Sequence, residues 1–200
     1  MANYILSCCT TADLTKEKFE ELGVEYCVFH FNVDGVDYPD DLGQSYPFPK
    51  FYDDMAKGAM TKTSQVSVGE YTEYFEKFLA QGKDIVHCAL SGGLSGTVQS
   101  ANIAADILRE KYPGRQIYVI DSLAASSGFG LLMAMLAKKR DEGASIEDIV
   151  NYAEEIKLNV NHWFFSTDLT FFVRGGRVSK ASGFIGNMLH ICPLLNVDYE

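Results

Sequence analysis

Long hydrophobic runs, basic clusters and a signal-peptide pattern are all missing from this chain of 200 residues. No apolar stretch approaches the roughly 20 residues of a membrane-spanning helix, so we expect no stable membrane insertion. Met1 is followed almost directly by the strand-like pair Ile5-Leu6 rather than by a signal peptide, which predicts a cytoplasmic protein. A net charge of −10 without a Lys/Arg cluster argues against a nucleic-acid partner.

The cysteines and histidines show no spacing typical of metal binding. The five cysteines are an odd number, and each lies in or beside an apolar run, which fits buried reduced thiols. No C-x-x-C spacing occurs, and the four histidines are scattered along the chain. We therefore predict neither disulfides nor a zinc or other metal site.

Motifs of three large enzyme classes are absent as well. The phosphate-binding pattern G-x-x-x-x-G-K-[ST] does not occur. Gly128-Phe129-Gly130 lacks the third glycine of a dinucleotide-binding fingerprint, and no serine is flanked by glycines in the G-x-S-x-G manner. Nucleotide hydrolysis and dinucleotide chemistry are therefore not expected.

Strand-like and helix-like segments alternate along most of the chain. Hydrophobic content of 47% with 22% charged residues is that of a soluble globular protein. The alternation predicts an α/β fold with a largely parallel sheet flanked by helices. The expected strands are 4–7, 24–33, 84–90, 116–120, 162–167 and 192–197. The expected helices are 16–22, 51–57, 68–80, 98–112, 131–141, 146–159 and 184–190, and 37–49 is expected to be an irregular loop.

The stretch around which the chain is arranged is Ser91-Gly92-Gly93-Leu94-Ser95-Gly96-Thr97, called here the glycine turn. It joins a buried strand to a helix. Its glycines allow close approach of the backbone, its hydroxyls can donate, and the helix start leaves N–H groups unpaired. This combination suits an anionic oxygen of a phosphate or a carboxylate. The alternative is an ordinary strand-to-helix loop with Ser or Thr as the helix cap.

Hydroxyl-bearing segments around Thr10, Thr63, Ser91 and Ser122 all follow expected strands or precede expected helices. In parallel sheets ligands bind at the carboxyl ends of the strands, so these segments could converge on one crevice. The alternative is that such loops are simply polar. Asp13 and Asp121, the acidic residues nearest these turns, are as suited to capping a turn as to acid–base work.

Two further features allow more than one interpretation. Ser91 or Ser95 as the nucleophile of an α/β hydrolase would need His87 as its base, but a histidine in an apolar strand is more often a packed core residue. The late aromatic residues would usually pack in a core, and the sharper alternative is the lining of a tunnel for a long apolar ligand. These residues are Phe164, Phe165, Phe171, Phe172 and Phe184, next to Met188 and Leu189.

Four segments, taken together and in order, resemble the DegV family of fatty-acid-binding proteins, which includes the binding subunits of bacterial fatty acid kinases. They are Thr63-Ser64-Gln65, the glycine turn with its flanks (90–101), Ile120-Asp121-Ser122 with Ala125-Ser126, and Arg174-Gly175-Gly176-Arg177-Val178-Ser179. The resemblance implies two α/β domains with one fatty acid between them. Here these would be residues 1–160 and the beginning of a second domain at 161–200. Family members are longer, so the resemblance also implies that the C-terminal part is lacking.

The resemblance further implies a carrier without catalytic residues or cofactor, which holds a fatty acid such as palmitate or oleate and presents it to a separate fatty acid kinase for acyl-phosphate formation. Its carboxylate-binding residues map to Thr63 and Ser91, with Ser64, Gly92 and Ser95 beside them. Arg174 and Arg177 are expected to face the partner or the phosphate, since arginine matches phosphate geometry.

The sequence departs from the family pattern at three points. Ser91-Gly92 stands where the family often has two serines, so one hydroxyl contact is lost or replaced. Cys8-Cys9 stands where many members have Asp-Ser after the first strand. The ligand-contacting histidine that some members carry near the C-terminus has no counterpart. We therefore expect a less acidic first strand end and an incomplete tunnel wall.

Overall fold

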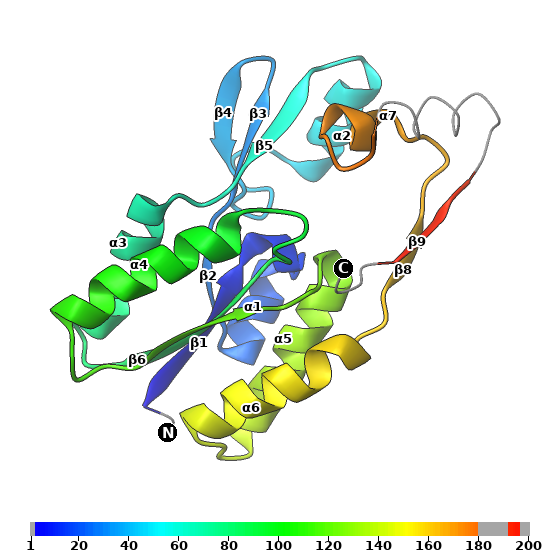
Figure 1. The fold of residues 1–200 in the computed structure, drawn as a ribbon. Helices are drawn as coiled ribbons and strands as arrows, with labels where there is room; N and C mark the ends of the chain where they lie inside the picture. The colour runs from blue at the N-terminus through cyan, green and yellow to red at the C-terminus, as the bar shows by residue number, and fades with distance from the viewer. Residues whose placement is uncertain (1–2, 180–191, 197–200) are drawn as a thin grey trace.

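A computed structural model describes residues 3–179 and 192–196. Its centre is a four-stranded parallel sheet in the order β2-β1-β6-β7 (Figure 1). The strands are β1 (Tyr4–Cys9), β2 (Glu25–Cys27), β6 (Asp84–Ala89) and β7 (Ile117–Asp121). β1 and β6 are buried almost along their whole length, as apolar strands with helices on both faces should be. The predicted α/β class with a parallel sheet is confirmed.

Helices cover both faces of this sheet. α3 (Val68–Leu79) and α4 (Thr97–Lys111) pack together on one face, and α5 (Ser126–Asp141) and α6 (Ile146–Ile156) pack together on the other, with α1 (Lys16–Leu22) beside α5 (Figure 1). Two short 3-10 turns, η1 (Thr10–Ala12) and η2 (Lys157–Asn159), continue β1 and α6.

The helix ends follow local sequence signals. The Lys18 N–H donates to Thr15 Oγ1 at the start of α1, and Gly23 ends the helix in the left-handed conformation with φ 56°. Ser67 and Ser145 each form a reciprocal capping box, with Glu70 in α3 and with Asp148 in α6. Three helices differ clearly from their expected bounds: α5 begins at Ser126 rather than at 131, α2 (Phe48–Ala56) begins at Phe48 rather than at 51, and α6 ends at Ile156 rather than at 159.

The prediction of one long strand over 24–33 was wrong. The chain forms β2 in the parallel sheet and then β3 (His30–Val33) in a separate antiparallel sheet of order β4-β3-β5. The break is at Phe29, whose N–H donates to Thr10 Oγ1 at 3.1 Å and whose carbonyl accepts from the Asp40 N–H at 2.8 Å. These bonds replace sheet pairing at Phe29, so the chain leaves the first sheet and enters the second.

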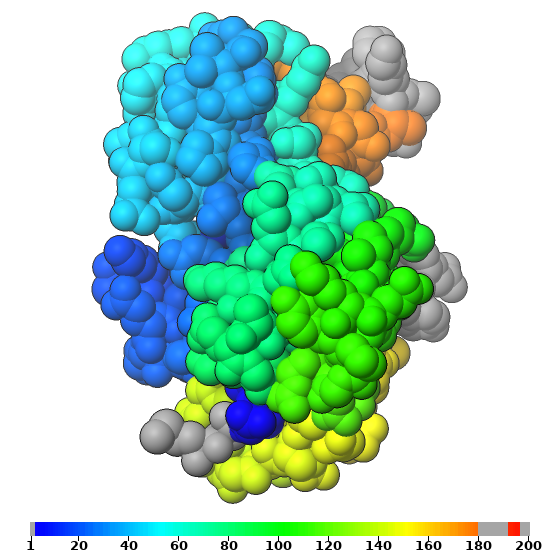
Figure 2. Space-filling model, turned by 90° about the vertical axis from the view of Figure 1, so that its left-hand side faces the viewer, coloured from blue at the N-terminus to red at the C-terminus, as the bar shows by residue number. Residues whose placement is uncertain are grey.

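The expected loop over 37–49 is irregular over residues 40–47. Its two ends belong to β4 (Val36–Pro39) and α2 (Phe48–Ala56), and the segment around Thr63 forms β5 (Thr61–Ser64). β4 and β5 both pair with β3, which supplies the backbone hydrogen bonds that make them strands. The composition of the two segments does not indicate such a partner. In Figure 2 this lobe forms the blue and cyan upper part, above the green surface of α3 and α4.

After α6 the chain forms β8 (Trp163–Phe165), which pairs antiparallel with β9 (Leu194–Asn196), and the short helix α7 (Thr170–Arg174). The expected helix over 184–190 lies outside the described residues. The division into domains at residue 160 stays a prediction. Across the described part of the chain, no helix combines the length and the hydropathy that crossing a bilayer requires.

Candidate carboxylate site

The glycine turn lies between β6 and α4 and is tightly folded on Ser91. The Ser91 N–H donates to the Ala124 carbonyl at 3.1 Å, and the Ser91 carbonyl accepts from the N–H groups of Leu94 and Ser95 at 3.0 and 3.2 Å. Ser91 is buried, and its hydroxyl accepts from the Gly93 N–H at 3.3 Å. The turn is therefore held by hydrogen bonds within it and by one to Ala124, beyond the end of β7.

Asp121 joins the turn to the end of β7. Its carboxylate accepts from the Gly92 N–H at 3.1 Å and from the Leu123 N–H at 3.0 Å. Leu123 and Ser126 take positive φ values of 49° and 50°, which a side chain larger than glycine adopts only at a cost. Asp121 thus caps two turns, one of the two roles expected for it. Asp13 also closes a turn, since its N–H donates to the Thr10 carbonyl at 3.0 Å.

Gln65 brings the Thr63-Ser64-Gln65 segment to the same place. Its side-chain Nε2 donates to Ser100 Oγ at 3.0 Å, in the first turns of α4. A Cβ atom on Gly96 would lie 2.8 Å from Gln65 Oε1, so this approach requires glycine. Three of the four segments that carry the family resemblance therefore meet at the carboxyl end of the parallel sheet.

Thr63 and Ser64 are exposed on the edge strand β5, and their side chains make no hydrogen bond among the described residues. Successive strand residues point to opposite faces. Thr63 pairs with Phe31 and Ser64 with His30, so the two hydroxyls lie on different faces of the antiparallel sheet.

The N-cap position of α4 has no side-chain hydrogen bond. Gly96, its N-cap residue, has no side chain to accept a hydrogen bond, and Ser95 Oγ accepts only from the Thr97 N–H, at 3.3 Å. The helix start carries partial positive charge, so a carboxylate or a phosphate would be stabilised beside it.

His87 does not pair with a serine of the glycine turn. Its Nδ1 hydrogen-bonds Ser7 Oγ at 2.7 Å, and its Nε2 lies 3.8 Å from Cys9 Sγ. The ring is fully buried and packs against Tyr71 and Phe75 with ring centroids 5.3 and 5.2 Å apart. Nothing in this arrangement supports the hydrolase alternative, because the base that Ser91 or Ser95 would need is engaged elsewhere.

A buried polar network runs from this histidine to the glycine turn. Cys9 Sγ receives a hydrogen bond from the Cys27 thiol at 3.6 Å and lies 3.3 Å from the Tyr71 hydroxyl, which contacts Thr97 Oγ1 at 2.8 Å. Burial raises the pKa of Cys9, but hydrogen bonds from Cys27, His87 and Tyr71 outweigh burial and hold that pKa well below the ordinary value. Burial raises the pKa of Cys27 well above its ordinary value.

Arg174 and Arg177 are not brought to the glycine turn by any described contact. Arg174 lies over the Phe171 ring at 5.3 Å, and Arg177 Nη1 donates to the Gly175 carbonyl at 2.5 Å. Their proposed partner-facing role stays a prediction. Of the late aromatic residues, Phe164 and Phe165 are exposed, and Phe184, with Met188 and Leu189, lies outside the described residues.

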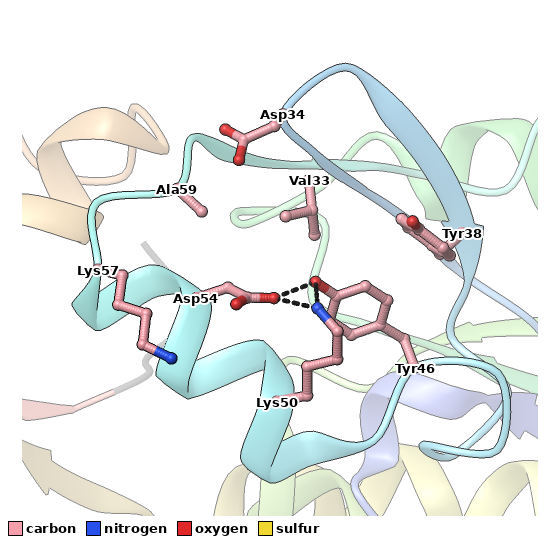
Figure 3. A pocket seen from close by; sticks show the side chains of 8 residues that line it. All are labelled: Val33, Asp34, Tyr38, Tyr46, Lys50, Asp54, Lys57 and Ala59. Carbon is pink, nitrogen blue, oxygen red and sulfur yellow. Dashed lines mark hydrogen bonds and ion pairs between the residues drawn. The ribbon is translucent and has the colours of Figure 1, made fainter.

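A separate hollow of about 340 Å³ lies in the other lobe, between α2 and the end of β3 (Figure 3). Lys50 Nζ donates to the Tyr46 hydroxyl at 2.8 Å, and both contact the Asp54 carboxylate. None of its lining residues belongs to the glycine turn or to β5. This polar hollow is therefore not the expected tunnel for an apolar tail.

Comparison with known proteins decides the family. The profile of the DegV family, described as "Uncharacterised protein, DegV family", matches residues 10–200. The chain belongs to the DegV family. A DegV domain-containing protein of Clostridium perfringens is 35% identical to this DegV chain over 198 residues, which cover 99% of this chain and 68% of that protein.

Solved structures share the fold. A fatty-acid-binding DegV family protein from Thermus thermophilus is 30% identical with a TM-score of 0.81, over 98% of this chain and 68% of that one. The Fatty Acid Kinase (Fak) B3 protein of Streptococcus pneumoniae, loaded with linoleic acid, has a TM-score of 0.80 over 99% of this chain and 69% of that one. At 23% identity this second likeness is one of fold alone. The DegV chain spans about two thirds of the length of these relatives.

Several residues that build the site could not be predicted from the sequence pattern. Gln65 and Asp121 were noted within segments but not as the groups that join them, because neither lies beside a glycine in the sequence. Tyr71 and the partners Cys9 and Cys27 lie far apart in sequence, and no local spacing indicates that they meet.

Proposed function

We propose that this DegV chain binds a long-chain fatty acid, such as palmitate or oleate, with the carboxylate at the glycine turn. The observation that carries the proposal is that three segments meet at the uncapped start of α4. Gln65 joins the Thr63 segment to α4, and Asp121 joins the end of β7 to the glycine turn that contains Ser91. Hydroxyls and backbone N–H groups hold a carboxylate there without a buried cation. The Thermus thermophilus relative, which binds fatty acid, supports the same ligand class.

Affinity would come mainly from the acyl tail. Each buried CH₂ contributes about 0.8 kcal/mol, so a sixteen-carbon chain gains on the order of 10 kcal/mol before ordering costs. The carboxylate contacts then fix the orientation of the ligand. In this role the chain is a carrier and not an enzyme.

The test is fatty-acid displacement with a fluorescent probe. Thr63→Ala and Ser91→Ala should each weaken binding by roughly 10- to 150-fold, because a hydrogen bond to a charged group contributes about 1.5–3 kcal/mol. Ser45→Ala is the matched control, since it removes an exposed hydroxyl outside the segments that meet at the glycine turn and should leave affinity within about twofold. Unchanged affinity in both test variants, with far-UV circular dichroism showing intact folding, contradicts the head-group assignment.

We further propose that the bound acid is presented to a separate fatty acid kinase, with Arg174 and Arg177 near the partner or the new phosphate. These are cations on an acidic chain, flanking a Gly-Gly turn. The fold shared with the pneumococcal Fak B3 protein is compatible with this role.

Arg177→Ala should keep fatty-acid affinity and lose most phosphorylation by the cognate kinase with ATP, measured as acyl-phosphate formation. Lys16→Ala, which removes an exposed charge at the start of α1, is the control, and the fatty acid bound to it should be phosphorylated normally. Normal phosphorylation of the acid bound to Arg177→Ala would remove Arg177 from the kinase proposal. It would leave the proposal of fatty-acid binding unchanged.

A further inference from the structure

Three potential metal ligands meet inside the protein, on the face of the parallel sheet that α3 covers. Cys9 pairs in register with Cys27 of β2, and Ser7, two residues earlier on β1, pairs with His87 of β6. Residues two apart on one strand, and residues paired in register on neighbouring strands, point to the same face. Register therefore places Cys9, Cys27 and His87 side by side, although they come from three separate strands.

Their ligand atoms have the spacing of a metal site. Cys27 Sγ lies 3.6 Å and His87 Nε2 lies 3.8 Å from Cys9 Sγ, and all three atoms are within 4.8 Å of one another. Around a tetrahedral zinc ion, with Zn–S of about 2.3 Å and Zn–N of about 2.0–2.1 Å, neighbouring ligand atoms lie roughly 3.5–3.8 Å apart. The observed spacing needs little movement to accept an ion.

Neighbouring hydroxyl groups orient His87 as a metal ligand. His87 Nδ1 is engaged by Ser7 Oγ, which also accepts from the Tyr74 hydroxyl at 3.1 Å. When a metal binds, the ring proton would lie on Nδ1 and donate to Ser7 Oγ, which leaves the Nε2 lone pair for the ion, as second-shell hydrogen bonds do in metal sites. The Tyr71 hydroxyl, 3.3 Å from Cys9 Sγ, is an oxygen available as a fourth ligand.

Charge and burial favour the same occupant. Cys9 and His87 are fully buried and Cys27 is 4% exposed, so an unpaired charge would be costly there. A divalent ion that displaces the two thiol protons leaves a site with no net charge. Thiolate and imidazole ligands together suit Zn²⁺ rather than Mg²⁺ or Ca²⁺.

We propose that Cys9, Cys27 and His87 form a Zn²⁺ site in the core of this chain, separate from the carboxylate site. The sequence spacing had predicted no metal site, because it could not show that three strands bring these residues together.

The experiment uses reduced, metal-stripped chain carrying Cys192→Ala, which removes the exposed thiol outside the cluster. After incubation with Zn²⁺ and desalting, elemental analysis should find about one ion per chain. Co²⁺ as the probe should give the thiolate-to-metal absorption and strong visible bands of a tetrahedral sulfur site. Cys27→Ala should lower the bound metal at least tenfold and abolish the thiolate band.

Cys88→Ala is the matched control, because Cys88 is a fully buried thiol on β6 next to His87 and points to the other face of the sheet. It should bind one ion like the parent. If Cys27→Ala does not fold, the parent chain still decides the matter, since Zn²⁺ bound only by the folded state must raise its melting temperature. Bound metal without a thiolate band, equal binding by Cys27→Ala, or no rise in melting temperature would each overturn the site.

Discussion

At the scale of single residues, two adjacent glycines of the glycine turn have different neighbours. A Cβ atom on Gly92 would lie 2.7 Å from Asp121 Oδ2, whereas one on Gly93 would lie 3.6 Å from Ser91 Oγ, an ordinary contact. Gly92 stands where the family often has a second serine, and its N–H donates to Asp121 instead. At position 92 the chain therefore has no hydroxyl, and its backbone lies close to the Asp121 carboxylate.

Gly92→Ala should lower the free energy of unfolding by about 1–2 kcal/mol, because the added methyl group displaces Asp121 from the N–H groups of Gly92 and Leu123. Urea unfolding measures the change. Gly93→Ala, one residue away, should cost no more than about 0.5 kcal/mol. Equal losses in the two variants would show that the Asp121 contact does not hold the turn.

At the scale of elements, the capping box at the start of α3 makes stability depend on pH. Burial raises the pKa of Glu70, but hydrogen bonds from Ser67 and the nearby His30, 3.4 Å away, outweigh it and hold that pKa below the ordinary value. A carboxyl with a lowered folded-state pKa stabilises the fold above its unfolded pKa of about 4.3, and this contribution is lost as pH falls through the folded pKa.

Glu70→Gln should therefore lower stability at neutral pH by about 0.5 kcal/mol, a small value because Glu70 is largely exposed. The difference from the parent should vanish at acid pH, below the folded-state pKa of the carboxyl. Melting temperatures across pH 3–7 test this. Glu73→Gln, an exposed residue of the same helix, is the control; a pH dependence equal to that of Glu70→Gln would refute the capping explanation.

At the scale of the whole molecule, the β8–β9 ribbon presents large apolar side chains to solvent. Trp163 is 61% exposed, Phe165 71% and Leu194 66%. Residues 163 and 165 share one face of the strand, and Leu194 pairs with Phe165. Phe164 and Phe165 are exposed rather than packed in a core, and exposed patches of this kind promote association.

We predict that the 200-residue chain self-associates through this ribbon. The double variant Trp163→Ser with Phe165→Ser should lower the mass measured by light scattering toward that of a monomer. Tyr52→Ser removes a comparably exposed aromatic residue from α2, at 65% exposure, and should leave the mass unchanged. A parent chain that is monomeric and uniform at high concentration contradicts the prediction.

The sequence by itself determined the class of fold and most of the helices. Thr15 and Gly23 bound α1, and the apolar runs of β1 and β6 indicated buried parallel strands, because caps and periodicity act over only a few residues. The glycine turn was also recognisable, since its glycines and hydroxyls are adjacent in the chain.

Contacts between residues far apart in the chain depend on how the whole core packs. The expected strand 24–33 divides because Thr10 Oγ1 accepts a hydrogen bond from the Phe29 N–H. The Thr63 segment lies beside the glycine turn because Gln65 donates to Ser100. The cluster of Cys9, Cys27 and His87 depends on the register of three strands. Each contact joins residues at least 18 positions apart, as Cys9 and Cys27 are. Propensity and spacing are local quantities, whereas sheet order and register are fixed by the packing of the whole core, so no local pattern could predict these contacts.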